Sequence, residues 1–532
     1  MRAADAIAKR LYEAGCRYAF GMPGGEVLTL VDALEAAGIR FVLAKHENAA
    51  GFMAEGAWHR TGAPGILVAT VGPGALNAVN TVANALQDRV PLIVLAGCVD
   101  AAEAQGYTHQ VLDQRAVFAP VTKADFTLEP GAAHLIADKA VAIATEGQPG
   151  PVFIDVPVAV ADAKVPDTLP ARRANAAPTV PAPEVMAELA DWLSSARRPV
   201  MIAGVDALNE SADIAGFAKA FGIPVITSYK AKGMLPEDHP LSLGGAGLSP
   251  LADKTLVPFV QSADLILCIG YDPIEMRPGW RDIWDARQTR VIDISAAPNT
   301  HYMHQASRNI VGSVAASLHA LSEAATPNAV WSGGEIARAK ADLAQAFPTD
   351  EVWGPAAVIA EARDALPAGT LATVDSGAHR ILLSQMWPCE APRGLTQSTA
   401  LCTMGCAVPL AMGAKLADPD RPVVSFSGDG GLLMVAGELS TAAELGLSCI
   451  FIVFVDASLA LIELKQRQRQ LSNHGVDFAA HDFAALGRAM GGEGVDVRSR
   501  SELRSAIEAA LKADRFTVIA AHIDRGAYDG RI

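Results

Sequence analysis

The feature that most constrains the fold is an alternation of short apolar runs with segments of helical periodicity along most of the chain. In the first 165 residues the β-type runs lie at 18–21, 40–44, 65–70, 91–96 and 151–156. Strands separated by helical segments predict βαβ units, which build a parallel sheet covered by helices. In two later blocks the runs lie at 199–207, 223–229, 263–273 and 289–295, and at 371–374, 423–426, 450–455 and 516–521.

Two stretches without periodicity divide the chain. Residues 166–183 concentrate Pro and Ala, and residues 326–351 form a polar, Ala-rich connection, so both are predicted linkers. We therefore expect an α/β protein with three consecutive doubly wound parallel-sheet domains, at 1–165, 184–325 and 352–532. The first and third blocks are candidates for a shared fold.

Composition excludes several classes of protein. The 532 residues are 51% hydrophobic and 19% charged, enough for sizeable cores, and 43 basic against 58 acidic residues give a net charge of −15. No positive field is available for nucleic acid, and no apolar run is long enough for a membrane span. The start of the chain lacks a signal-peptide pattern and the seven cysteines form no CxxC pair, so we expect a cytoplasmic location.

The strongest local signal is Gly428-Asp429-Gly430-Gly431, directly after an apolar run. A second apolar run ends at Asp456, 27 positions after Asp429. Both carboxylates are expected at the carboxyl edge of a parallel sheet, beside glycines that let backbone N–H groups approach a phosphate. This arrangement suits Mg²⁺ bound to a diphosphate. The alternative is a tight turn with Asp456 as a helix cap.

The pattern resembles the binding motif for thiamin diphosphate (ThDP), and a second motif of those enzymes has a counterpart at 45–54. There the resemblance makes Glu47 the catalytic glutamate that hydrogen-bonds the aminopyrimidine ring. An isolated Glu would otherwise be a solvated residue at a helix start. The same resemblance implies that Mg²⁺ is held by Asp429, Asp456 and the carbonyl of Ser458.

Two further segments resemble acetohydroxyacid (acetolactate) synthases. Residues 69–77 resemble their TSGPGxxN element, and residues 400–409 resemble the loop that supports ThDP in a V shape. Met404 would be the supporting residue, with its N–H at the pyrimidine ring and the Cys402 carbonyl at the 4′-amino group, although Met often only fills a core. The other implied cofactor contacts are Gly24, Gly25, Gly72, Pro73, Asn77, Ala378, His379, Gly428, Gly430, Gly431 and Leu461. His379 would be a donor near the diphosphate, or else merely a helix-start histidine.

Within this family, the segments 107–113, 118–123, 269–275 and 455–458 look most like the catabolic, FAD-independent acetolactate synthases. Their counterparts make His109 and Gln110 catalytic candidates at the thiazolium end, although a His–Gln pair in a loop is commonly a surface feature. Residues 24–26, 87–91 and Lys465 depart from the catabolic pattern, which leaves the substrate open. The central block lacks GxGxxG after its first strand, and we expect no FAD.

The implied reaction is ThDP- and Mg²⁺-dependent decarboxylation of a 2-oxo acid, pyruvate being the first candidate. Joining the resulting enamine to a second carbonyl would give acetolactate or a similar 2-hydroxy-3-oxo acid. A non-ligating 2-oxo-acid decarboxylase, another ThDP lyase and a non-catalytic regulatory subunit stay open as alternatives. The resemblance also implies a homodimer or homotetramer, because in this family the Glu-bearing domain of one subunit faces the GDG-bearing domain of its neighbour.

Overall fold

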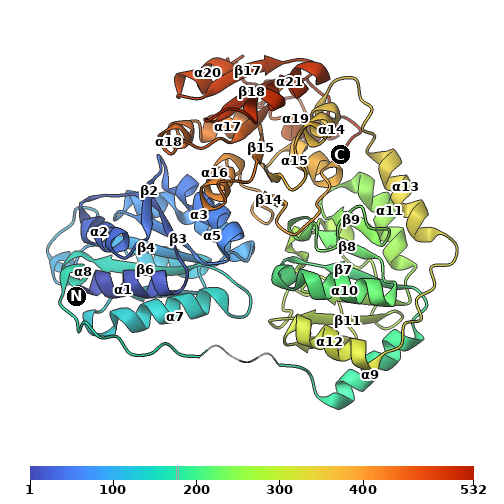
Figure 1. Ribbon diagram of the computed structural model, residues 1–532, viewed down its shortest axis with the longest axis horizontal. Helices are drawn as coiled ribbons and strands as arrows, with labels where there is room; N and C mark the ends of the chain where they lie inside the picture. The colour runs from blue at the N-terminus through green and yellow to red at the C-terminus, as the bar shows by residue number, and fades with distance from the viewer. Residues whose placement is uncertain (175–176, 178) are drawn as a thin grey trace.

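Three α/β domains, each built on a six-stranded parallel sheet, make up the computed structural model, which describes residues 1–174, 177 and 179–532 (Figure 1). The predicted fold class is confirmed. Residues 175–176 and 178 of the predicted linker 166–183 lie outside the described residues. In Figure 1 the first domain lies at the left, the central domain at the right and the third domain above them.

The first domain has the strand order β2-β1-β3-β4-β6-β5, and every neighbouring pair is parallel. Its strands are β1 (Tyr18–Met22), β2 (Arg40–Leu43), β3 (Gly65–Ala69), β4 (Leu92–Cys98), β5 (Ala124–Thr127) and β6 (Val152–Pro157). Its helices are α1 (Ala3–Glu13), α2 (Leu28–Ala36), α3 (Glu47–Thr61), α4 (Pro73–Asn77), α5 (Val79–Gln87), α6 (Gln114–Phe118), α7 (Ala133–Thr145) and α8 (Val158–Asp162).

The central domain has the order β12-β11-β10-β7-β8-β9. Its strands are β7 (Pro199–Ala203), β8 (Val225–Ser228), β9 (Ser242–Ala246), β10 (Leu265–Ile269), β11 (Arg290–Ser295) and β12 (Arg308–Val311). Its helices are α9 (Pro183–Ser195), α10 (Ser211–Phe221), α11 (Pro250–Gln261) and α12 (Val314–Ala324). The predicted connection 326–351 contains one more helix, α13 (Glu335–Ala346), which packs against α11.

The third domain has the order β14-β13-β15-β16-β18-β17, which repeats the strand order of the first domain. Its strands are β13 (Leu371–Val374), β14 (Leu395–Gln397), β15 (Val423–Gly428), β16 (Ile450–Val455), β17 (Glu493–Val497) and β18 (Thr517–His522). Its helices are α14 (Pro355–Ala365), α15 (Ala378–Met386), α16 (Ala407–Ala417), α17 (Asp429–Met434), α18 (Glu438–Glu444), α19 (Ala460–Gln468), α20 (Phe483–Ala489) and α21 (Arg500–Ala510).

Burial explains why the central strands form. β3 is buried throughout, and β4 and β16 are buried along all but their last residue, so both faces of these strands are covered. Uninterrupted apolar runs are typical of parallel strands that have helices on both sides. In the first sheet, alternate residues such as Leu67 and Val68 belong to two separate hydrophobic cores.

The first and third domains of the chain meet where α3 crosses α16. A Cβ at Gly56 would lie 2.2 Å from the Leu410 carbonyl oxygen, and one at Gly413 would lie 1.9 Å from that of Met53. The two backbones therefore touch at glycines, and a larger residue at either position would force them apart. This crossing orients α3, at whose first residue Glu47 lies.

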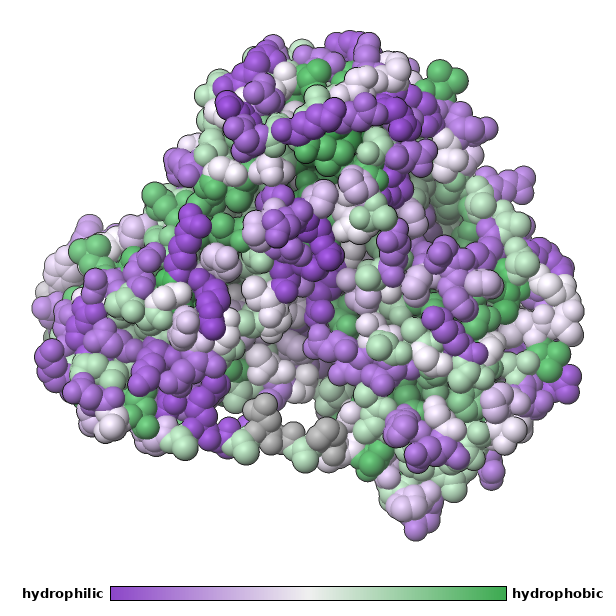
Figure 2. All heavy atoms as spheres, viewed as in Figure 1, coloured by the Kyte–Doolittle hydropathy of each residue, from purple (hydrophilic) through white to green (hydrophobic). Residues whose placement is uncertain are grey.

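On the face shown in Figure 2, polar residues predominate and apolar patches are small and scattered between them. Within the described residues, no helix combines the length and apolar character needed to cross a membrane.

Candidate active site

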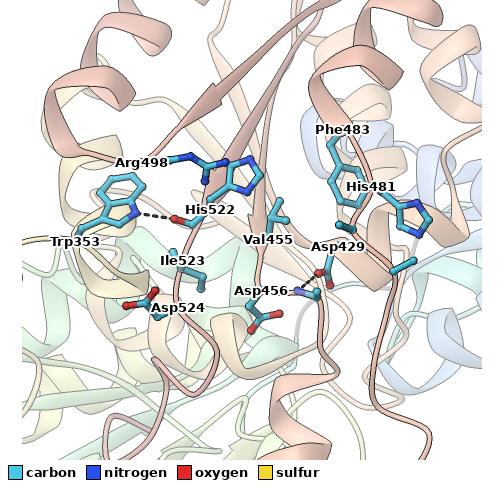
Figure 3. A pocket seen from close by; sticks show the side chains of 13 residues that line it. Trp353, Asp429, Val455, Asp456, His481, Phe483, Arg498, His522, Ile523 and Asp524 are labelled. Atoms are coloured by element: carbon cyan, nitrogen blue, oxygen red, sulfur yellow. Dashed lines mark hydrogen bonds between the residues drawn. The ribbon is translucent and has the colours of Figure 1, made fainter.

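The two acidic residues of the strongest sequence signal lie at one edge of the third sheet. β15 ends at Gly428 beside Phe454 of β16, so Asp429 and Asp456 follow neighbouring parallel strands. The Ala457 N–H donates to Asp429 Oδ2 at 2.8 Å, the contact drawn as a dashed line in Figure 3. Ala457 adopts φ +55°, a left-handed conformation that costs energy in a residue with a Cβ.

The electrostatics of this pair favour a bound cation. Burial and the neighbouring charge of Asp429 raise the pKa of Asp456 to about 7, and burial raises the pKa of Asp429. Two buried carboxylates repel each other unless a positive charge lies between them. No cluster of three or more His, Cys, Asp and Glu side chains suited to a metal occurs within the described residues. Carboxylate oxygens are the ligands that hard divalent cations prefer, so the pair itself fits such a cation.

Three glycines beside the carboxylates occupy positions that no larger residue could take. A Cβ at Gly431 would lie 1.8 Å from Asp375 Oδ2, one at Gly430 would lie 2.8 Å from the Phe478 ring, and one at Gly377 would lie 2.5 Å from His379 Cε1. Side chains are thus excluded at all three positions. All three glycines line the cavity described below, where a residue without a side chain lets backbone N–H groups lie close to a phosphate.

His379 adds an unpaired donor to this surface. Its ring is buried and stacks on Phe454 with centroids 5.4 Å apart, and its Nε2 has no hydrogen-bond partner. Burial and the adjacent Arg380 lower the pKa of His379 to about 3, so the imidazole is neutral. A neutral imidazole protonated at Nε2 can donate one hydrogen bond to a phosphate oxygen. The unsatisfied atom, the glycines and the carboxylates together fit a diphosphate with a divalent cation.

The third-domain residues predicted to bind the cofactor and metal surround one cavity of about 530 Å³. The central domain contributes Leu248, Pro250 and Arg277, which the sequence analysis did not predict. The predicted residues that line the cavity are Ala378, His379, Cys402, Met404, Gly428, Asp429, Gly430, Gly431, Asp456, Ser458 and Leu461. A second cavity, of about 410 Å³, lies against the same two carboxylates and is lined by His481, Arg498 and His522 (Figure 3).

Two buried acids that the sequence analysis missed support this cavity. Asp375, at the end of β13, accepts the N–H groups of Gly405 (2.9 Å) and Cys406 (3.1 Å), and burial raises its pKa to about 6. Glu463 accepts hydrogen bonds from the hydroxyl of Ser458 and from Arg525. Asp375 directly follows a buried strand, as Asp456 does, so its position in the sequence could have indicated a site residue. No such pattern marks Glu463.

The candidate residues of the first domain form a separate group. Glu47 is 4% exposed, so it is not a solvated helix-start glutamate, and its Oε2 accepts the Asn77 Nδ2–H group at 3.0 Å. A Cβ at Gly74, one residue beyond Pro73, would lie 3.0 Å from Glu47 Oε1. The short helix α4, which contains Gly74 and Asn77, thus packs directly on the carboxylate.

Gln110 lies beside Gly72, the residue that precedes α4, and Gly24 lies beside Thr70, two residues earlier. The Gln110 side chain lies 3.6 Å from a Cβ placed on Gly72, and a Cβ on Gly24 would lie 2.2 Å from Thr70 Oγ1. Gln110 adopts φ +57°, whereas His109 is exposed in the single chain. Exposed apolar side chains surround this group at Leu76, Tyr107, Val111 and Leu112.

The two groups do not line one common cavity in the single chain. Glu47 and the other first-domain candidates are absent from the walls of the third-domain cavity, as far as the described residues define it.

Comparison with known proteins assigns the class. The thiamine pyrophosphate enzyme models match in chain order: the N-terminal TPP binding domain at residues 1–117, the central domain at 186–321 and the C-terminal TPP binding domain at 375–521. These are the domains of a ThDP-dependent enzyme.

Full-length relatives narrow the class to a family. The large subunit of acetolactate synthase isozyme 1 from Escherichia coli is 31% identical, over 98% of this chain and 94% of the relative. The catabolic acetolactate synthase of Raoultella terrigena is 29% identical, over 98% and 95%. A probable 2-ketoarginine decarboxylase of Pseudomonas aeruginosa is 30% identical, over 92% and 88%. The chain belongs to the acetolactate synthase family of ThDP-dependent enzymes.

Proposed function

We propose that this protein decarboxylates pyruvate and joins the remaining two-carbon unit to a second 2-oxo acid, giving acetolactate or a similar 2-hydroxy-3-oxo acid. The observation that carries the proposal is the gathering of the predicted third-domain residues around one cavity that suits a diphosphate and a cation. The buried Glu47 in the first domain supplies the complementary half. Similar identities to synthases and to a probable decarboxylase keep a non-ligating decarboxylase as the second candidate.

Each half of the site has a defined task in this reaction. When bound, ThDP supplies the nucleophilic carbon and the electron sink that decarboxylation requires. Asp429, Asp456 and the Ser458 carbonyl would hold Mg²⁺ beside the diphosphate, and His379 would donate from Nε2 to a phosphate oxygen. Glu47 would share a proton with a nitrogen of the aminopyrimidine ring, and Asn77 fixes its carboxylate through the 3.0 Å hydrogen bond.

His109 and Gln110 are proposed to handle the second substrate rather than the cofactor. His109→Ala and Gln110→Ala are expected to change the ratio of acetolactate to acetaldehyde formed from pyruvate, because proton delivery and acceptor binding compete at this point. The control is Gln105→Ala, which replaces an exposed residue whose side-chain amide donates to the Ala101 carbonyl. Product analysis by chromatography decides. An unchanged ratio in both variants, with only reduced stability, would make the pair structural.

A ratio dominated by acetaldehyde in the wild-type protein would instead favour the second candidate, the simple decarboxylase. A predominance of acetolactate supports carboligation.

The separated half-sites lead us to propose a homodimer or homotetramer in which Glu47 of one subunit serves the cavity of its neighbour. Light scattering is expected to show a dimer or tetramer, and dilution to monomers is expected to abolish turnover, because each monomer keeps only half-sites. A monomer with full activity would contradict this arrangement.

We also propose that the central domain carries no FAD. Doubly wound sheets bind ligands where the strand order reverses, which in this sheet is between β7 and β10. First-domain side chains already reach the acids that follow those strands: Arg89 donates to Asp272 at 2.6 Å and Gln148 donates to Asp206 at 2.7 Å. The purified protein is expected to lack flavin absorption in the visible spectrum. A stoichiometric flavin band would overturn this prediction.

A further inference from the structure

A fully buried lysine joins all three domains at the base of the loop 398–404, which contains Cys402 and Met404. Lys230 follows β8 in the central domain, and its Nζ lies 2.8 Å from Glu55 Oε1 and 2.9 Å from Asp88 Oδ2. Glu55 belongs to α3, whose first residue is Glu47, and Asp88 ends α5. All three side chains are at most 3% exposed.

The charges in this cluster are retained despite burial. Burial alone would lower the pKa of Lys230, but Asp88 and Glu55 outweigh it and raise that pKa. Burial would raise the pKa of Glu55, but Lys230 and His59 outweigh it and lower that pKa. A buried ion triad is costly unless its remaining lone pairs are well satisfied. The hydrogen bonds that the remaining lone pairs accept show which segment of the chain the cluster holds.

Both carboxylate oxygens of Asp88 accept hydrogen bonds from the third domain. Its Oδ2 accepts the Thr399 N–H at 2.9 Å, and its Oδ1 accepts the Ala400 N–H at 2.9 Å. Beside it, Asn84 Oδ1 accepts the Ser398 hydroxyl at 2.6 Å, and Ser398 Oγ in turn accepts the Thr403 N–H at 2.9 Å. The base of the loop is thus fixed by the first domain of the same chain.

The loop needs such support because its backbone is strained. Cys402 adopts φ +55°, a left-handed conformation that is unfavourable for a residue with a Cβ. A conformation of this kind persists only where surrounding contacts over-determine it. Asp88 constrains the loop on one side of Cys402, and Asp375, through Gly405 and Cys406, constrains it on the other.

We propose that Asp88 and Lys230 are positioning residues that hold the 398–404 loop in the conformation required for cofactor binding. This inference rests on the proposed function for the identity of the cofactor as ThDP. Lys230 acts by holding the Asp88 carboxylate in the position where it accepts the N–H groups of Thr399 and Ala400. Because Glu55 lies two turns along α3 from Glu47, the same cluster ties the helix of the proposed catalytic glutamate to the loop.

The test compares Lys230→Met with Lys232→Met in the full-length protein. Lys232 is a matched control, because it is fully buried in the same segment and pairs with Glu237 at 2.8 Å, and among the described residues no hydrogen bond or ion pair joins it to the loop 398–404. Both variants are expected to lower the melting temperature, since each removes a buried ammonium group. Amide hydrogen exchange of residues 399–405 is measured without cofactor, and ThDP affinity is measured by titration with Mg²⁺.

Lys230→Met is expected to accelerate exchange at 399–405 and weaken ThDP binding by roughly tenfold, while Lys232→Met leaves both within about twofold of wild type. Equal effects of the two variants would make the triad merely structural and overturn the inference. Should Lys230→Met fail to fold, Asp88→Asn replaces it, since the amide keeps one acceptor and is expected to release one of the two loop N–H groups. Unchanged exchange at both Thr399 and Ala400 in Asp88→Asn would likewise overturn the inference. If wild-type protein binds no ThDP, the proposed function fails, but the exchange comparison still decides whether the triad holds the loop.

Discussion

Glu47→Gln is expected to reduce turnover by roughly 10²-fold to 10⁴-fold or more while ThDP remains bound. The amide keeps the shape of the buried side chain, but it cannot share a proton with the aminopyrimidine ring as a carboxylate does. The hydrogen bond from Asn77 still finds an acceptor oxygen in the variant, so the packing of α4 on residue 47 is expected to persist. Steady-state rates and ThDP titrations measure the two effects separately.

The matched control for this substitution is Glu361→Gln. Glu361 is also a buried glutamate, but it pairs with Arg500 and Arg504 and lies outside the cavity walls. The Glu361→Gln variant is expected to be less stable than the wild type but to keep its turnover number. Wild-type turnover in Glu47→Gln would remove Glu47 from the reaction, and a loss of ThDP binding equal to the loss of turnover would assign it to binding alone.

Asp456→Ala is expected to weaken ThDP affinity by well over tenfold, about 1.4 kcal/mol or more. The reason is that Asp429 and Asp456 repel each other across the site, as the raised pKa of Asp456 indicates, until a divalent cation binds both. Removing one of the two carboxylate ligands weakens binding of the cation, and binding of the diphosphate weakens with it. Asp456→Asn keeps one oxygen ligand and is expected to retain substantial activity with Mg²⁺, whereas chelation of the metal is expected to prevent cofactor binding in the wild type.

Ser458→Ala is the companion variant, because only the backbone carbonyl of Ser458 is proposed to reach the metal. Its effect on ThDP affinity is expected to be mild, although the hydroxyl contact with Glu463 is lost. If Asp456 served only as a local cap, Asp456→Ala would cost about 1 kcal/mol of stability and its ThDP titration would match that of the wild type. That titration separates the two roles.

The strands that the sequence did not predict are all at sheet edges. The apolar runs identified β3, β4, β15 and β16 because these strands are covered on both faces. The missed strands are short, partly exposed or rich in glycine, and so lack an uninterrupted apolar run: β5, β9, β12, β14 and β17. Edge strands have only one paired neighbour, and their residues need not be apolar.

The candidate site divides in the same way. Asp429 and Asp456 could be found because the end of a buried strand marks each of them. Asp88 and Lys230 could not. The segment 87–91 stands out only as a departure from the catabolic pattern, and Lys230 belongs to no motif. The two become functional candidates through a contact between residues 142 positions apart. Arg277 lines the cavity from the central domain, and no motif near it in the sequence indicates this position. Periodicity reports burial along one segment, whereas these residues depend on how separate domains pack.

The most direct test of the account is CO₂ release and coupled product, measured together, from a panel of 2-oxo acids with and without ThDP and Mg²⁺. The account predicts that CO₂ is released only when both are present, and that pyruvate yields acetolactate. A protein that binds ThDP but releases no CO₂ from any member of the panel would be a non-catalytic subunit and would contradict the account.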